Sequence, residues 1–343
     1  MISTFYKLAT IGAIATMALS GQNSGPDRIS LNPTDSAAAR AATQRSSHGL
    51  RSHSATAQTL APSSLGVSER SSSGPSGAGT SSSNSPLRFP ADLTNRGGAV
   101  VPYAQSHAIY MNPVTAASPN GACTIASCWG DPEGFLRDLA DSDFIHITDQ
   151  YVGVRTDNRY TVGKSAMVKY VPSGAAFTDD DILATIHAVA ITTGQAGYGH
   201  IYHVFLPPGQ DVCESLGICA SNAICAYHGS GDFFDLGHVI YTVEPDQLGF
   251  GCAVAPGSPN GSRVDSTNSV LSHEVFETVT DPDSNAWANT TTVDLLQQEI
   301  GDECSFINAL NAFDVPAFKI GNKIYAVQRE YDNKSHGCST KPA

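Results

Sequence analysis

The run SHEVFETVTDP, residues 272–282, carries the side chains best suited to chemistry in this chain of 343 residues. On a helix, His273 and Glu277 lie four residues apart and point the same way, and Asp281 continues the row. An H-E-x-x-H helix uses this geometry to hold zinc with two histidines while its glutamate activates water. Zinc also accepts carboxylate ligands. The spacing therefore predicts His273 and Glu277 as zinc ligands and Glu274 as the general base.

A third ligand must come from another part of the chain. The run EIGDEC supplies Glu299 and Asp302 just before Cys304, which a disulfide would hold rigid, and Asp281 is the local alternative. Three protein ligands leave a fourth position, in which a water molecule becomes a nucleophile near neutral pH. Two carboxylate ligands donate more charge than two imidazoles and weaken the Lewis acid. The motif therefore argues for metal binding more directly than for catalysis.

The alternative is an amphipathic helix whose polar face is only solvated. The apolar residues gather on the side opposite the His–Glu row, as in any helix with one buried face; they are Leu271, Val275, Phe276 and Val279. A pattern as short as H-E-x-x-E also occurs by chance. Under this alternative the acidic row has no ligand.

The remaining histidines give weaker signals. His200 and His203 lie in the apolar run HIYHVFL, where a spacing of three sends them to opposite faces of a strand, so one should be a core residue. His228, in CAYHG, is expected in a loop beside Cys225, where packing is favoured over a role in the site. The sequence holds no G-x-S-x-G nucleophile elbow, phosphate-binding loop or dinucleotide fingerprint.

Alternating strand and helix patterns must position these residues. Apolar runs predict strands at residues 107–111, 144–147, 166–171, 200–206 and 238–243. Thr178 with Asp181 forms a capping box before a helix over residues 179–192, and a second helix is expected over residues 266–280. Gly321-Asn322 predicts the turn of a hairpin. The order indicates an α/β fold, a mixed sheet with flanking helices, in which the second helix would be a zincin-like active helix.

The first 86 residues differ in composition from the rest. Residues 1–20 resemble a secretory signal peptide, with Lys7 near the start, an uncharged apolar run, and Ala18 and Ser20 at the cleavage site. Residues 21–86 contain no aromatic residue and are rich in Ser, Ala, Gly and Pro, so we expect disorder. Residues 87–343 are long enough for one globular domain. We therefore expect a secreted protein.

Cysteine usage and charge narrow the class of protein further. All eight cysteines follow residue 122 and no C-x-x-C pair occurs, which indicates disulfides, with Cys123–Cys128 and Cys304–Cys338 the favoured pairs. The net charge is −13. Because the first 86 residues are net positive, the domain itself is strongly acidic, which argues against a nucleic-acid partner. No run after the leader is long and apolar enough to span a membrane.

Several runs occur together in a pattern that resembles one family. In order they are IYHVFLPPG, CAYHG, SVLSHEVFETVTDP with a following AW, EIGDEC and VQREYDNKSHGC. This order resembles the exordium-like, or phosphate-induced protein, family, and its microbial branch most closely, from about His107 to Cys338. That branch carries H-E-x-x-E, T-D-P and E-I-G-D-x-C, matched here by His273, Glu274, Glu277, Thr280, Asp281, Pro282, Glu299, Asp302 and Cys304.

The resemblance implies an extracellular protein. Plant members of the family are associated with the cell wall and with growth responses, but that branch lacks the His–Glu pair, so the growth role does not carry over. The microbial branch is similar to zinc peptidases at the helix. We therefore expect a metal-dependent hydrolase of peptidase type, with zinc as cofactor and a peptide or cell-wall polymer as partner. The alternative is a non-catalytic extracellular or cell-wall-associated protein with a structural acidic or metal site.

Overall fold

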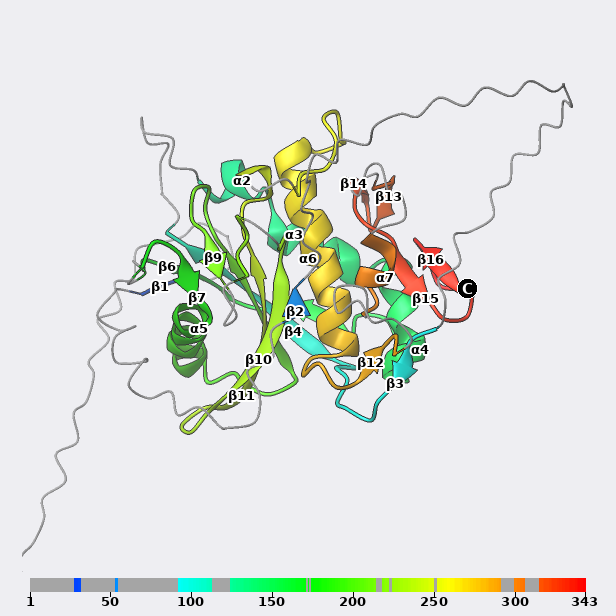
Figure 1. Cartoon of the computed structure of the whole chain (residues 1–343), viewed down its shortest axis with the longest axis horizontal. Coiled ribbons are helices and arrows are strands. Elements are labelled where there is room, and N and C mark those ends of the chain that lie inside the picture. The colour runs from blue at the N-terminus through cyan, green and yellow to red at the C-terminus, as the bar shows by residue number, and fades with distance from the viewer. Residues whose placement is uncertain are drawn as a thin grey trace, which may run out of the picture.

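The computed structural model describes residues 28–31, 53–54, 92–112, 124–170, 172, 174–213, 218–221, 224–249, 252–290, 299–305 and 315–343. An eight-stranded mixed sheet lies at its centre (Figure 1). Its strands are β1 (Arg28–Leu31), β2 (His53–Ser54), β4 (Ala104–Met111), β5 (Tyr160–Val162), β6 (Ser165–Val168), β8 (His200–Phe205), β10 (Tyr227–Phe233) and β11 (Gly237–Glu244).

The strand order is β1–β6–β4–β8–β11–β10–β2, with β5 also paired to β4. The pairs from β1 to β11 are parallel, whereas β10 runs antiparallel to both β11 and β2. Four two-stranded pairs lie outside this sheet. They are β3 (Thr94–Asn95) with β12 (Trp287–Ala288), β7 (Phe177–Thr178) with β9 (Val212–Cys213), β13 (Ala317–Ile320) with β14 (Lys323–Ala326), and β15 (Glu330–Asp332) with β16 (Gly337–Ser339).

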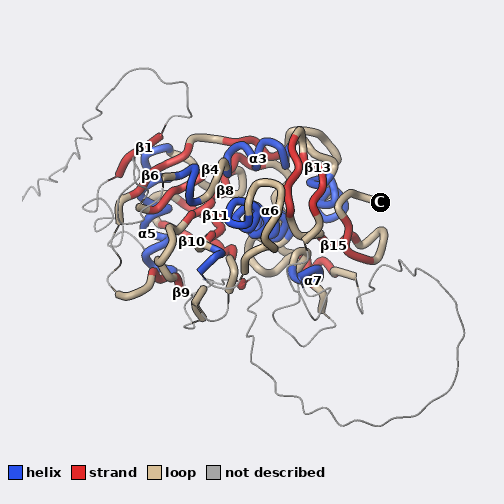
Figure 2. The backbone as a smooth tube through the Cα atoms, turned by 90° about the horizontal axis from the view of Figure 1, so that it is seen from above, coloured by secondary structure: helices blue, strands red, loops and turns tan. Residues whose placement is uncertain are grey.

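Helices cover both faces of the sheet. The helices of the described residues are α2 (Ile125–Cys128), α3 (Pro132–Ala140), α4 (Asp149–Val152), α5 (Asp179–Thr193), α6 (Ser262–Thr280) and α7 (Asp302–Ser305), with short 3₁₀ turns η1 (Phe144–Thr148) and η2 (Gln247–Gly249). Seen from above, α6 lies between the sheet and the β13–β16 hairpins (Figure 2). Helix α6 is therefore enclosed by the fold.

Alternation along the strands divides the interior into two cores. Tyr202 and Val204 of β8 pack with α5, whereas Ile201 and Phe205 pack with α3 and α6. By the same alternation, every second residue of β8, β10 and β11 faces α6. Four of the residues on this face are polar and fully buried: His203, His228, Thr242 and Glu244.

Most of the predicted elements are present. The mixed α/β class is confirmed, and the capping box of Thr178 and Asp181 begins α5 as expected. The hairpin turn falls at Gly321, whose φ of 57° suits glycine. Helix α6 begins at Ser262, four residues before the predicted start.

Two expectations differ from the structure. The strand predicted at 144–147 is wrong, because these residues form the 3₁₀ turn η1, with the Phe144 ring 4.7 Å from that of Phe276. A run of four apolar residues fits a buried turn as well as a strand, and its periodicity cannot separate the two. Within the segment expected to be disordered, residues 28–31 and 53–54 form strands at opposite edges of the sheet.

Three disulfides link described residues: Cys213–Cys219, Cys225–Cys252 and Cys304–Cys338. The last confirms one predicted pair. Cys128 is also disulfide-bonded, and its expected partner, residue 123, lies outside the described residues, as does the predicted signal peptide. Among the residues that the structure describes, no helix is long and apolar enough to cross a membrane.

Candidate metal centre

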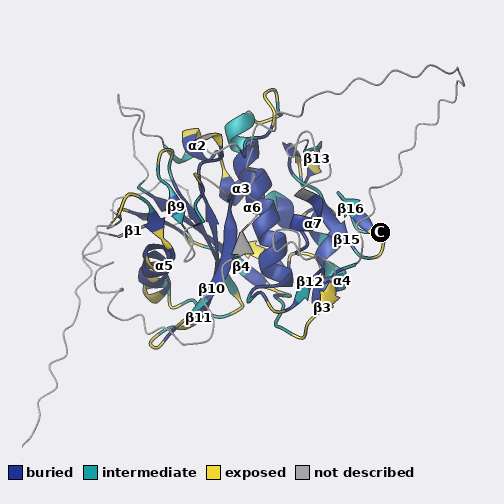
Figure 3. Ribbon diagram, viewed as in Figure 1, coloured by how far each residue is buried: buried dark blue, intermediate teal, exposed yellow. Residues whose placement is uncertain are grey.

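Helix α6 is buried on its polar face as well as on its apolar one. Every residue from Asp265 to Thr280 is buried, and Glu274 and Glu277 are 0% exposed (Figure 3). The solvated-face alternative is therefore wrong. Burying an ionised carboxylate without a partner costs several kcal/mol, so a buried acidic row requires a compensating charge or proton.

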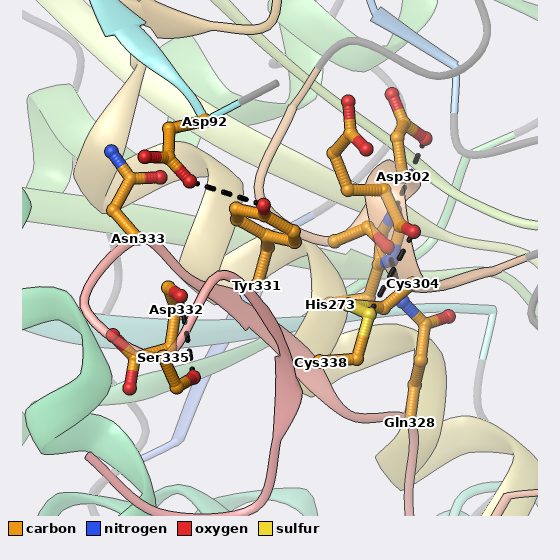
Figure 4. The surroundings of a disulfide bond; sticks show 12 residues. Asp92, His273, Asp302, Cys304, Gln328, Tyr331, Asp332, Asn333, Ser335 and Cys338 are labelled. Carbon is orange, nitrogen blue, oxygen red and sulfur yellow. Dashed lines mark hydrogen bonds and ion pairs between the residues drawn. A yellow bond between two sulfur atoms is a disulfide. The ribbon is translucent and has the colours of Figure 1, made fainter. Parts of the chain in front are cut away.

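The predicted residues meet at the centre of α6. The Nε2 atom of His273 lies 3.1 Å from Oε1 of Glu277 and 3.9 Å from Oδ1 of Asp302. The backbone N–H of Asp302 donates to Glu277 Oε1 at 3.2 Å. Figure 4 shows His273 beside Asp302. One imidazole nitrogen thus lies close to the carboxylates of two residues, and imidazole nitrogens and carboxylate oxygens are both accepted ligands of zinc.

His228 forms the other side of the cluster. It lies on β10, opposite Thr242 of β11, and is fully buried. Its Nε2 atom is 3.3 Å from Oε2 of Glu299 and 3.9 Å from Oε2 of Glu277. The sequence placed His228 in a loop with a packing role, whereas the strand alternation turns it towards α6. Tyr227 and His228 point to opposite faces of β10, but the glycines that follow them hide this strand pattern in the sequence.

Two further carboxylates were missed by the sequence analysis. Glu244 of β11 and Glu330 of β15 are fully buried, and both interact electrostatically with the cluster. Thr242 Oγ1 donates to Glu244 Oε1 at 2.8 Å. Among the residues that the structure describes, both oxygens of Glu330 and both oxygens of Glu274 are buried without a hydrogen-bond partner. The described protein groups therefore supply fewer hydrogen-bond donors than the carboxylate oxygens of this centre can accept.

The segment of Glu299 and Asp302 is fixed from two sides. The Cys304–Cys338 disulfide joins it to β16, beside His273 in Figure 4. The Tyr331 N–H donates to the Ile300 carbonyl at 3.0 Å. A Cβ on Gly301 would lie 2.4 Å from Nδ1 of His273, so only glycine lets this segment approach the ring.

Gln328 sets the proton position on His273. Its Nε2 atom lies 3.0 Å from His273 Nδ1 and also donates to the Gly301 carbonyl at 2.5 Å. An amide nitrogen only donates, so Nδ1 accepts and the neutral ring carries its proton on Nε2. A metal on Nε2 requires the other tautomer, with the Gln328 amide turned so that its oxygen accepts from Nδ1.

Asp281 lies at the end of α6 and has other partners. Its Oδ1 atom accepts from the backbone N–H groups of Asn285 and Ala286 at 2.5 and 2.6 Å. Its Oδ2 atom pairs with Arg96 at 2.7 Å. Both oxygens are thus engaged in closing the helix and the following turn.

Burial governs the titration of the cluster. Desolvation, followed by repulsion from Glu277, raises the pKa of Glu274 well above its usual range. Desolvation and neighbouring carboxylates raise the pKa values of Glu277, Asp302 and Glu330 in the same way. Desolvation lowers the pKa of His228 to about 4, so this imidazole is neutral at pH 7. Neutral imidazoles beside carboxylates make a donor set suited to a divalent cation.

No family model, curated protein or solved structure matches the chain. The exordium-like resemblance therefore remains a prediction carried by the motifs themselves.

Proposed function

We propose that this protein is a secreted, divalent-metal-dependent hydrolase of peptidase type, with zinc held by His273, Glu277 and Asp302. One observation carries the proposal. Among the described residues, Oε2 of Glu277 and both oxygens of Glu274 are buried without a hydrogen-bond partner, and so is Nε2 of His273, which lies 3.1 Å from Oε1 of Glu277. Buried polar groups normally have hydrogen-bond partners, so a cluster of such groups without them supports a bound ion and its water.

A bound zinc ion would supply a Lewis acid that polarises a carbonyl group and acidifies water. The protein residues supply the rest of the chemistry. Glu274, next to the ligand His273, would accept the proton of the attacking water and later return it to the leaving amine. In this proposal α6 is a zincin-like active helix.

The substrate class rests on the resemblance to the exordium-like family and on the zinc-peptidase pattern at the helix. We propose a peptide or a cell-wall polymer as the partner. Disulfides favour an oxidising, extracellular environment, which agrees with the proposed signal peptide.

One observation favours the second candidate, a non-catalytic extracellular protein with a structural metal site. The ligand side chains are almost completely buried: His273 is 3% exposed, Asp302 2% and Glu277 0%. Structural zinc sites are closed, whereas catalytic sites keep a position open to water and substrate. The two candidates share the metal and differ only in the role of Glu274.

Substitution of Glu274 separates the two candidates. The full chain and its Glu274→Gln variant would be loaded with zinc and assayed on a peptide library and on cell-wall polymers. The hydrolase proposal expects activity in the parent, a loss of at least about 100-fold in the variant and unchanged zinc content. Glu133→Gln is the matched control, since this buried carboxylate lies on α3 and accepts a hydrogen bond from Tyr110. Equal activity of Glu274→Gln and the parent would refute the base role, and a zinc-loaded parent without activity would favour the structural site.

A further inference from the structure

The cluster contains two candidate ligand groups that share one residue. One consists of His273, Glu274 and Glu277, and the other of His228, Glu277 and Glu299; in each group the ligand atoms lie within 4.8 Å of one another. Glu277 belongs to both. Its Oε1 atom is 3.1 Å from Nε2 of His273, and its Oε2 atom is 3.9 Å from Nε2 of His228. The two oxygens of one carboxylate therefore serve two imidazoles.

We propose that the centre holds two divalent cations bridged by Glu277, the first beside His273 and Asp302 and the second beside His228 and Glu299. This inference rests on the proposed function and extends it by a second metal site. Carboxylate-bridged pairs of ions about 3.5–4 Å apart are an established arrangement in hydrolytic enzymes.

The second group has the chemistry of a metal site in its own right. It combines an imidazole nitrogen with two carboxylates, and all three side chains are 0–1% exposed. The separation of 3.3 Å between His228 Nε2 and Glu299 Oε2 is about that between two ligands of one zinc ion, given metal–ligand distances near 2.0–2.2 Å. The ligands come from β10, from α6 and from the segment before α7. Three elements thus fix the group.

Charge provides a separate argument for a second ion. Six buried carboxylates face this centre: Glu244, Glu274, Glu277, Glu299, Asp302 and Glu330. Within the described residues, no ion pair joins Glu244, Glu274, Glu277 or Glu330 to a lysine or arginine. One divalent ion offsets two of these charges, whereas two ions offset four. The buried, unpartnered Oε2 of Glu277 lies on the His228 side and points to the same place.

Zinc stoichiometry tests the inference. The full chain would be stripped with chelator, reloaded with zinc, desalted and measured by elemental analysis and native mass spectrometry. We expect two zinc ions per chain in the parent and one in His228→Ala. His187→Ala is the matched control, since this buried histidine of α5 pairs with Asp235 outside the centre, and this variant should keep two ions.

The outcomes distinguish the inference from the proposed function. One zinc ion in the parent and in His228→Ala, with none in His273→Ala, overturns the second site and leaves the proposed single-ion hydrolase standing. No zinc in the parent overturns both. Because His228→Ala can fail to fold, the parent loaded with cobalt(II) gives an independent result. A magnetically coupled pair in its electron paramagnetic resonance spectrum supports the bridge, and an uncoupled signal contradicts it.

Discussion

At the scale of single residues, the centre depends on one close approach. Gly301 passes the ring of His273 so closely that any side chain would collide with Nδ1 and Cε1. The same ring edge receives the Gln328 amide, which orients it. If His273 is the proposed ligand, Gly301 and Gln328 position it without touching the metal, as outer-shell partners do in metal proteins.

Gly301→Ala should displace the His273 ring. We expect a loss of about 1–3 kcal/mol in the free energy of unfolding and a zinc affinity lowered by about 10-fold or more. Gly199→Ala is the matched control, because no atom lies within 4 Å of a Cβ at that position. Urea unfolding and zinc titration measure the two effects. Equal zinc affinity in the two variants would show that the ring is not held by this contact.

At the scale of elements, α6 ends at Thr280, three residues after the proposed ligand Glu277. Asp281 closes it by accepting two backbone N–H groups and pairing with Arg96. The Cys304–Cys338 disulfide attaches the Glu299–Asp302 segment to β16. Each element therefore depends on a specific tether for its position at the centre.

Substitution of Asp281 separates a helix-end role from a ligand role. Asp281→Ala leaves two N–H groups without their acceptor and should cost about 2 kcal/mol or more. Asp281→Asn keeps an acceptor oxygen, so it should cost less and retain the full zinc content. Chemical unfolding and elemental analysis check both. Loss of zinc in Asp281→Asn would instead support Asp281 as the third zinc ligand, the alternative that the sequence also allows.

Removal of the Cys304–Cys338 disulfide should weaken metal binding as well as the fold. The double Cys→Ser variant should lose about 2–5 kcal/mol of stability and bind zinc more weakly, because Glu299 and Asp302 lose their tether. The control is the corresponding variant of Cys213–Cys219, a disulfide with a sequence separation of 6 whose first cysteine lies in β9. That variant should melt at a lower temperature with zinc affinity unchanged. Equal zinc affinities in both variants would contradict the tether.

Local signals predicted the elements better than the centre. The capping box of α5, the Gly321 turn and the H-E-x-x-E spacing act within a few residues, so the sequence displays them directly. Glu330 and Glu244 join the site only through sheet and hairpin pairing, which no local pattern encodes. The same holds for His228, which joins the site through the pairing of β10 with β11. The burial of both faces of α6 also depends on layers that form from distant segments.

At the scale of the whole molecule, the fold encloses an acidic centre between a sheet and a layer of hairpins. Desolvation raises the pKa of Glu244 to about 8, and burial also raises the pKa of Asp281, to about 7. The metal-free native state therefore binds more protons than the unfolded chain, in which these groups titrate near their usual values. The stability of the metal-free protein should follow this difference.

Between about pH 6.5 and pH 8 the metal-free protein should lose stability as the pH rises, because each raised carboxyl group then loses a proton that it holds only in the folded state. The slope for each such group is at most about 1.4 kcal/mol per pH unit. The desolvated histidines oppose this trend only below their ordinary pKa of about 6.5. Zinc displaces protons from its ligands, so the zinc-loaded protein should gain stability over the same range. Thermal unfolding with and without chelator checks the sign, and parallel curves would argue against a metal in the centre.

The central claim is that the buried face of α6 binds a divalent metal, and elemental analysis of the natively purified full chain tests it most directly. We predict stoichiometric zinc, at least one ion per chain, in the parent and a loss of it in the His273→Ala, Glu277→Ala double variant. The His187→Ala variant, made on α5, should keep the parent's zinc content. A natively folded parent that contains no stoichiometric metal and takes up none on reloading would contradict the account.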